Sequence, residues 1–320
     1  MLWVISGSPF LPSTDTYYHL TMARLLPSLG FIHAFPWLHW TFFRDHFVSH
    51  HFGFHVLLAP LVWVSEQWTG DLVLGGKAAV TLGMGLTAAF FCAILRARSL
   101  SHALAWTCLL GCLPWHFWMR LAYVRAPIMA LPLLLLAALL FIRQKPWGLF
   151  ICGCLFSWLY LGAVTAALIP AAFLAGHLLG GSWTRRLWDC VILFGLGLAA
   201  GLVISPYFPD NLSFLWVQMF SAGFGATTDV PSEWLPFNAW FFLKICAPLL
   251  VIWLCALVYR LRQPAPLDGA AISLLVLNLL FFLMTVKSRR FIEYWPVFAL
   301  LSAADLARFS LKDFDALSGL

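Results

Sequence analysis

The chain has 320 residues, of which 62% are hydrophobic and only 10% are charged. A soluble globular domain carries roughly 25% charged residues, so this composition excludes a water-soluble fold and predicts an integral membrane protein. The net charge of +6 does not indicate a nucleic-acid partner, because Lys and Arg collect in the cytoplasmic loops of membrane proteins.

Long apolar runs joined by short connections predict an all-α, polytopic transmembrane helix bundle with about nine or ten apolar helices, since a span needs about 20 apolar residues. The runs lie at 53–66, 72–95, 102–119, 127–142, 147–163, 164–180, 187–205, 239–258, 269–286 and 294–307.

Basic clusters recur at every second connection from residue 96 onward, which is the positive-inside pattern of cytoplasmic loops. These clusters are Arg96/Arg98, Arg143/Lys145, Arg185/Arg186 and Arg260/Arg262. The pattern predicts that 120–126, 206–238 and 287–293 lie on the extracytoplasmic side.

We expect one transmembrane domain over 1–320, with 7–52 as a first extracytoplasmic loop carrying amphipathic helices and 206–238 as a second large loop. Only Met1–Ile5 precede the polar turn that opens at Ser6, and five residues cannot cross a bilayer. A first transmembrane helix is therefore expected to be missing from this sequence.

The run 53–66 has two interpretations. It is short for a span and carries His55 and Glu66, so we expect it to be half-inserted or interfacial. If it spans instead, Arg96 and Arg98 move outside, against the charge pattern of the later loops.

Asp15 lies in the segment Ser-Thr-Asp-Thr-Tyr-Tyr-His, ahead of an amphipathic helix predicted over Thr16 to Leu26 and ended near Pro27 and Gly30. The N–H groups and dipole of a helix N-terminus hold a carboxylate ionised, which suits a general base or a metal ligand. The alternative is that Asp15 is a plain N-cap.

The first loop is rich in histidine and aromatic residues, which suits a sugar or headgroup but also an ordinary interfacial loop. His46, His50, His51 and His55 have i, i+4 spacings, which place pairs on one helix face. With Asp45 they could bind a divalent metal; hydrogen bonding to an anionic or hydroxylated ligand is the favoured interpretation.

Two short outer loops carry arginines against the positive-inside bias. Arg120 and Arg125 lie in one, and Arg289 and Arg290 follow Lys287 in the other. Paired guanidiniums bind phosphate well because their fork matches the anion. The alternative is neutralisation by Glu293 or by lipid headgroups.

At this point the sequence resembles a family. Thr-Asp-Thr-Tyr-Tyr-His-Leu at 14–20, followed by Ala23-Arg24-Leu25 and Gly30, resembles the first outer loop of the GT-C glycosyltransferases, closest to the catalytic subunit of oligosaccharyltransferases. His50-His51-Phe-Gly-Phe resembles the stretch that enters their next helix. Arg290-Phe-Ile-Glu-Tyr-Trp-Pro resembles the Arg-Tyr-x-x-Pro pattern of protein mannosyltransferase-like members. No Trp-Trp-Asp-Tyr-Gly motif is present in the sequence.

The resemblance implies a glycosyltransferase that uses a polyprenyl-phosphate sugar donor and a glycan, lipid or protein acceptor on the extracytoplasmic face. It implies Asp15, with Asp45 as the candidate second acid, as catalytic residues or as ligands of a possible Mg²⁺ or Mn²⁺ ion. It also implies the lipid phosphate at Arg290 with Arg289. From the residues themselves we add Arg125 to the phosphate site and expect the substrate at Tyr18, His19, His50, His51 and Glu233. We expect a multi-pass protein of a bacterial or archaeal plasma membrane.

Two rival functions remain open at this stage. A transporter or flippase of a lipid or sugar would have inverted repeats and Gly- or Pro-broken helices at matching positions. Pro114, Pro127 and Pro170 are candidate breaks, but the sequence has no visible symmetry. A non-catalytic scaffold has no need of titratable side chains concentrated on one face.

Overall fold

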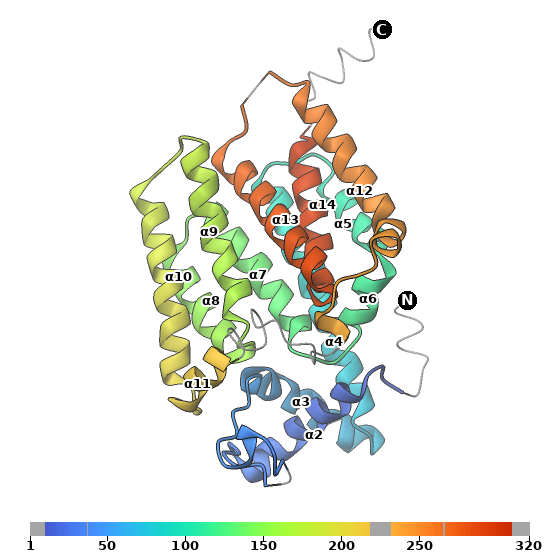
Figure 1. Cartoon of the computed structure of the whole chain (residues 1–320), viewed down its shortest axis with the longest axis vertical. Coiled ribbons are helices and arrows are strands. Elements are labelled where there is room, and N and C mark those ends of the chain that lie inside the picture. The colour runs from blue at the N-terminus through green and yellow to red at the C-terminus, as the bar shows by residue number, and fades with distance from the viewer. Residues whose placement is uncertain (1–9, 37, 218–231, 265, 309–320) are drawn as a thin grey trace.

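Every regular element in the described residues of the computed structural model is helical (Figure 1). The described residues are 10–36, 38–217, 232–264 and 266–308. Residues 218–231 of the second large loop predicted at 206–238, including Asp229, lie outside them, as does the start of the chain through residue 9.

The α-helices follow one another along the chain with short connections. They are α2 (Thr14–Leu29), α3 (Phe52–Thr69), α4 (Val73–Ala97), α5 (Ala103–Cys108), α6 (Trp115–Leu121), α7 (Pro127–Ile142), α8 (Pro146–Leu159), α9 (Ala163–Leu179), α10 (Arg185–Ile204), α11 (Asp210–Trp216), α12 (Ala239–Leu261), α13 (Gly269–Lys287) and α14 (Trp295–Leu306). Short 3₁₀ turns are η1 (Phe42–Arg44), η2 (Leu109–Cys112), η4 (Ser232–Trp234) and η5 (Arg289–Glu293).

The predicted all-α transmembrane bundle is confirmed. In the described part of the chain, α4, α10, α12 and α13 are long and apolar enough to cross a bilayer, and shorter apolar helices accompany them. The run 102–119 was predicted as one helix and is instead broken into α5, η2 and α6. The break falls at Leu113, whose backbone is extended at ψ 157°, because Pro114 disfavours a helical conformation in the residue before it.

The bundle has two distinct ends (Figure 1). We call the end that carries α2 and α3 the loop end; the connections 120–126 and 287–294 also lie there. The opposite end carries the α9–α10 and α12–α13 connections. At the opposite end Arg98 donates to Asp305 at 2.9 Å and to Asp268 at 2.8 Å, which ties α4 to α13 and α14. The predicted basic clusters thus gather at the end away from α2, while the membrane face that each end meets stays a prediction.

Small residues bring α8 and α10 into close contact. A Cβ at Gly153 would lie 2.7 Å from the Phe194 carbonyl oxygen, so a larger side chain would push the two helices apart. Lipid offers little hydrophobic drive for helix association, and close backbone approach at small residues supplies van der Waals contact instead.

Helix α3 packs between α2 and α4 at the loop end. It buries Phe54, His55 and Leu58, while Trp63 and Trp68 are 61% and 80% exposed. Helix α3 has the length of a span but is not among the four helices that are also apolar enough to cross. Its interfacial placement stays a prediction. Its position beside α2 brings His55 next to His19.

Candidate functional site

Helix α2 presents the first acidic residue of the site. It runs from Thr14 through Pro27 to Leu29, longer at both ends than predicted, and closes at Gly30, whose φ of +64° suits glycine. Asp15 lies in the first turn, and Ser13 holds the N-cap position without a side-chain cap bond. The N-cap interpretation of Asp15 is therefore wrong: its carboxylate contacts Arg125 at 3.5 Å instead.

Six charged side chains form what we call the loop-end ion network: Asp15, Arg120, Arg125, Glu233, Arg290 and Glu293. Arg125 is its centre, with Glu293 at 2.9 Å and both Asp15 and Glu233 at 3.5 Å. The network joins α2, the end of α6 with the α6–α7 connection, η4 and η5, which are far apart in the sequence.

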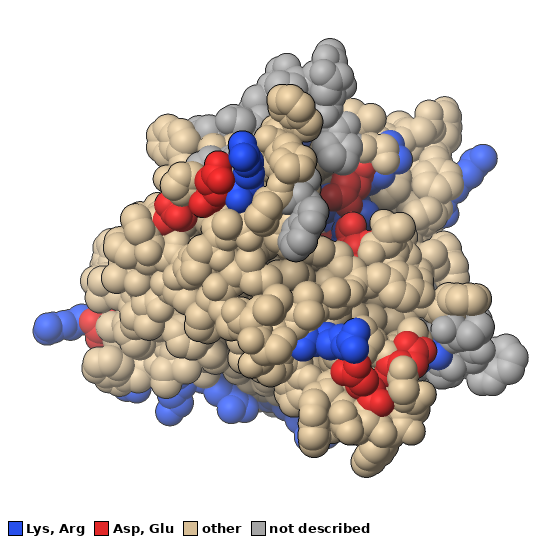
Figure 2. Space-filling model, turned by 90° about the horizontal axis from the view of Figure 1, so that it is seen from below, with Lys and Arg blue, Asp and Glu red and all other residues tan. Residues whose placement is uncertain are grey.

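Glu233 carries the network on to Arg290. Its carboxylate lies 3.4 Å from Arg290 and 2.9 Å from Arg120. Asp15 and Arg290 are therefore linked through two intermediates, Arg125 and Glu233. The structure places at one end of the bundle an acid and a guanidinium that the sequence separates by most of its length. Figure 2 views that end and shows several places where acidic and basic side chains lie together, with further basic side chains along one edge of the view.

The network holds Glu233 and Arg290 charged. Burial raises the pKa of Glu233, but the guanidiniums of Arg290, Arg120 and Arg125 outweigh it and lower the pKa overall. Burial acts to lower the pKa of Arg290, and its anionic surroundings, including Glu293 and Glu233, raise it instead. Both groups are therefore ionised at neutral pH.

Arg289 and Arg290 are neighbours in the sequence but point to different surroundings. Arg290 lies over the Trp234 ring at 5.0 Å and faces Glu233. Arg289 donates to the carbonyl oxygens of Leu235 and Pro236, each at 3.2 Å. The sequence prediction grouped the two arginines at one phosphate; the structure brings only Arg290 into the ion network.

A cluster of buried histidines adjoins the network. His19 Nδ1 and His55 Nε2 are 2.8 Å apart, and Ser49 Oγ lies 3.0 Å from His55 Nδ1. Burial, together with nearby positive groups, lowers the pKa of His19 to about 2 and that of His55 to about 3. These imidazoles are neutral, so each ring offers one donor and one acceptor.

The same cluster extends toward Arg290. The His51 ring stacks on Tyr160 with centroids 5.4 Å apart, and the His50 ring stacks on Phe214 at 4.9 Å. Burial and then the charge of Arg290 lower the pKa of His50 to about 4. Because Arg290 acts on His50 electrostatically, the histidine cluster and the ion network form one continuous polar region.

Several buried polar atoms of this region have no hydrogen-bond partner among the described residues. They are Glu293 Oε2, Arg125 Nε and His51 Nδ1. Buried polar groups are normally paired, so such atoms need a partner that is not part of the described chain. A polar ligand or water would satisfy them.

Asp45 is not brought into the network. Its carboxylate is 74% exposed, and its ion-pair partner is Arg44 at 3.9 Å. Its role as second acid stays a prediction without support from this geometry. His46 lies 3.5 Å from Asp210 rather than with His50 and His51. Within the ranges that the structure describes, no group of three or more His, Cys, Asp and Glu side chains is placed to hold a metal ion.

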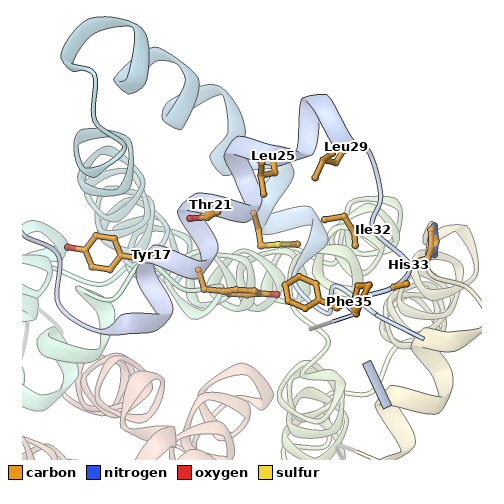
Figure 3. Close-up of a pocket in the computed structure, with 11 residues that line it drawn as sticks. Tyr17, Thr21, Leu25, Leu29, Ile32, His33 and Phe35 are labelled. Carbon is orange, nitrogen blue, oxygen red and sulfur yellow. The ribbon is translucent and has the colours of Figure 1, made fainter. Parts of the chain in front are cut away.

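An apolar cavity of about 670 Å³ lies between α2 and the segment that follows it (Figure 3). Tyr17, Thr21, Leu25 and Leu29 line it from the helix, and Ile32 to Pro36 close it from the following segment. Tyr18 lines the cavity and also packs edge-on against His19, with centroids 5.1 Å apart. This tyrosine separates the apolar cavity from the histidine cluster.

Sequence reasoning underestimated Glu293 and Arg120. Glu293 was considered as a neutralising group, yet it is fully buried and accepts from Arg120 at 2.5 Å and from Arg125 at 2.9 Å. The available signal was its place between Arg290 and the apolar α14, because a carboxylate entering a membrane-buried segment needs a cationic partner.

Comparison with known proteins gives a fold but no family. No protein-family model matches the chain, and no curated protein matches it. The crystal structure of the Archaeoglobus fulgidus oligosaccharyltransferase in its apo form matches with a TM-score of 0.62 at 13% sequence identity. The match covers 94% of this chain and 46% of that one. The chain thus has a GT-C-like fold and spans about half the length of that protein.

Proposed function

We propose that the protein is a membrane glycosyltransferase that moves a sugar from a polyprenyl-phosphate donor to an acceptor on the extracytoplasmic face. One observation carries the proposal: the ion network joins the carboxylate of Asp15 to the guanidinium of Arg290 through Arg125 and Glu233. The similarity in fold to an oligosaccharyltransferase supports glycosyl transfer as the reaction class.

In this proposal Arg290 and Arg125 bind the phosphate of the donor. Charge-assisted contacts of good geometry are about 2.7–2.9 Å long. The contacts of Glu233 with Arg290 and Arg125 are 3.4 and 3.5 Å, so both guanidiniums have binding capacity left. A phosphate can take it up without dismantling the shorter pairs of Glu293 with Arg120 and Arg125.

Asp15 acts as the general base. The acceptor attacks the anomeric carbon of the sugar, and its proton passes to the Asp15 carboxylate. The bond from the anomeric carbon to the phosphate oxygen breaks, and its electrons stay on the phosphate. Positioned general bases contribute about 10²–10⁴ in rate. Arginines that hold the departing phosphate at a partly buried site stabilise the charge that develops there.

The histidine cluster and Tyr18 position the sugar. Neutral His19 and His55 can donate to and accept from hydroxyl groups. Because they are uncharged, they do not compete with Arg290 for the phosphate. Glu233, which contacts both phosphate-binding arginines, orients them.

A divalent cation fits poorly in the described residues. Mg²⁺ and Mn²⁺ take several oxygen ligands at once, and the carboxylates of Glu233 and Glu293 are engaged by guanidiniums. Asp15, with a 57% exposed side chain, is the network carboxylate best placed to take such an ion. The proposed reaction therefore uses the side chains of this chain alone.

The test is sugar transfer by the purified full chain in liposomes with a polyprenyl-phosphate sugar. We expect Asp15→Asn to lower turnover by about 10²-fold or more, and Arg290→Gln to lower it through weaker donor binding. The matched controls are Asp189→Asn and Arg262→Gln, which change exposed residues of the same type outside the network. Wild-type turnover in both Asp15→Asn and Arg290→Gln would overturn the proposal.

A further inference from the structure

A smaller cavity with a basic wall lies at the loop end, next to the ion network and separate from the apolar cavity of Figure 3. It measures about 200 Å³ and is lined by Trp115, His116, Met119, Arg120, Tyr123, Phe237 and Arg289. Sites for drug-sized ligands are roughly 300–1,000 Å³. This cavity is therefore sized for a small group and not for a whole sugar-lipid donor.

Arg289 brings uncompensated positive charge to the cavity. Its hydrogen-bond partners are the neutral carbonyls of Leu235 and Pro236, and its guanidinium lies 5.8 Å from the Phe237 ring centre. No carboxylate in the described part of the chain forms an ion pair with it. The ion network next to it is balanced, with three arginines and three carboxylates. Because the partners of Arg289 are neutral and the network beside it is balanced, Arg289 leaves one excess positive charge in the cavity wall.

His116 adds an unused polar atom to the same wall. Its Nδ1 is buried and has no partner among the described residues. The ring is fixed edge-on against Phe241, with centroids 5.0 Å apart, and burial lowers the His116 pKa. The imidazole is thus a neutral group with hydrogen-bonding capacity, and it lines the same cavity as the guanidiniums of Arg120 and Arg289.

The rim of the cavity is aromatic. Trp115 lines it and is 54% exposed, and Phe241, which packs on His116, is 41% exposed. Exposed Trp at the end of a membrane bundle is typical of the headgroup level of a bilayer. The cavity therefore combines a cationic wall with a membrane-facing rim.

We propose that the cavity between Arg120 and Arg289 binds a phosphate group, carried by an anionic lipid headgroup or present as free phosphate. Guanidiniums match phosphate oxygens in charge and geometry, and His116 supplies a neutral hydrogen bond. The site is distinct from the donor phosphate at Arg290 and Arg125, and it does not depend on the proposed reaction.

The test measures binding to the full chain in a neutral detergent by calorimetry. The two probes are dihexanoyl-phosphatidylglycerol and inorganic phosphate. We expect Arg289→Gln to weaken binding about tenfold or more, since one charged hydrogen-bonding group is lost, and Arg289→Lys to lose less because the charge remains. Met119→Trp fills the cavity without changing charge and should also block binding.

Arg262→Gln is the matched control, an exposed arginine that follows α12 near the opposite end of the bundle. Saturable binding of the lipid that is sensitive to Arg289→Gln assigns the site to a headgroup. The same sensitivity with inorganic phosphate alone assigns it to free phosphate. The proposal is overturned if neither probe binds, or if Arg289→Gln binds as tightly as Arg262→Gln.

Discussion

Glu293→Gln probes whether the ion network depends on a buried charge. Glu293 is fully buried, and its Oε1 accepts from Arg120 at 2.5 Å and from Arg125 at 2.9 Å. The substitution keeps the shape of the side chain and one acceptor oxygen, and it removes the negative charge. Three arginines then share two carboxylates, so one guanidinium loses its compensating charge.

The cost follows from that uncompensated charge. Removing one partner of a buried ion pair typically destabilises a protein by about 3–5 kcal/mol. Gln retains a hydrogen bond, and both arginines keep their contact with Glu233. We therefore expect the free energy of unfolding to fall by about 3 kcal/mol, the lower end of that range. At the ~2 °C per kcal/mol of larger domains, the apparent melting temperature in detergent falls by roughly 6 °C.

The control is Glu66→Gln, the same substitution in an accessible pair. Glu66 and Arg24 are 2.8 Å apart with side chains 29% and 54% exposed, and such pairs contribute about 0–1 kcal/mol. A double-mutant cycle with Arg120→Gln isolates the coupling, expected at about 1–3 kcal/mol. Equal melting temperatures for Glu293→Gln and Glu66→Gln, or a coupling near zero, would refute the reasoning.

Three further outcomes are expected. Gly53→Ala should lower the melting temperature and turnover together, because the new Cβ would lie 2.7 Å from the Trp158 carbonyl carbon, whereas Gly85→Ala, in open space, should be neutral. Burial lowers the pKa of His55 to about 3 in the folded state, against 6.5 when unfolded. Its stabilising contribution is therefore full above pH 6.5 and declines as the pH falls toward 3, with a loss on the order of 1 kcal/mol at pH 5.5. Thermal melts of His55→Asn should show a shallower acid decline. Arg98→Gln should lower the melting temperature, because the 4% exposed Asp305 loses its partner, yet leave turnover of the folded enzyme unchanged in the liposome assay.

The helices were predictable because apolar runs of bilayer length have few alternatives to a helix. The predicted runs at 72–95, 127–142 and 269–286 begin and end within two residues of α4, α7 and α13. The failure at 102–119 has a local cause: Pro114 interrupts a run whose composition alone indicates one continuous helix.

The residues of the site could be predicted from the sequence, but the ion pairs among them could not. Asp15 and Arg290 were identified because charge on an otherwise apolar chain is conspicuous. Arg125 and Glu233 were also expected in the site, at the lipid phosphate and at the substrate. Their contact with each other was not predicted, because it forms only after segments far apart in the sequence fold together. The separation of Arg289 from Arg290 depends on the side-chain directions in the 3₁₀ turn η5, which no spacing rule of an α-helix describes.

The distribution of charge also bears on the transporter alternative. Alternating access requires contacts at each end of a bundle to break in turn while one part rocks against another. Here Arg98 ties α4 to α13 and α14 at the opposite end with contacts of 2.8–2.9 Å. The loop end has contacts that are as short, those of Glu293 with Arg120 and Arg125 at 2.5 and 2.9 Å. It also has longer contacts of Glu233 with Arg290 and Arg125, 3.4 and 3.5 Å. Short ion pairs therefore hold both ends of the bundle, and alternating access would have to break those at each end in turn. In a transporter, Arg98→Gln would remove contacts that have to break in each cycle and would change the rate of lipid or sugar movement across the liposome membrane. A transport rate in that variant equal to wild type would argue against alternating access.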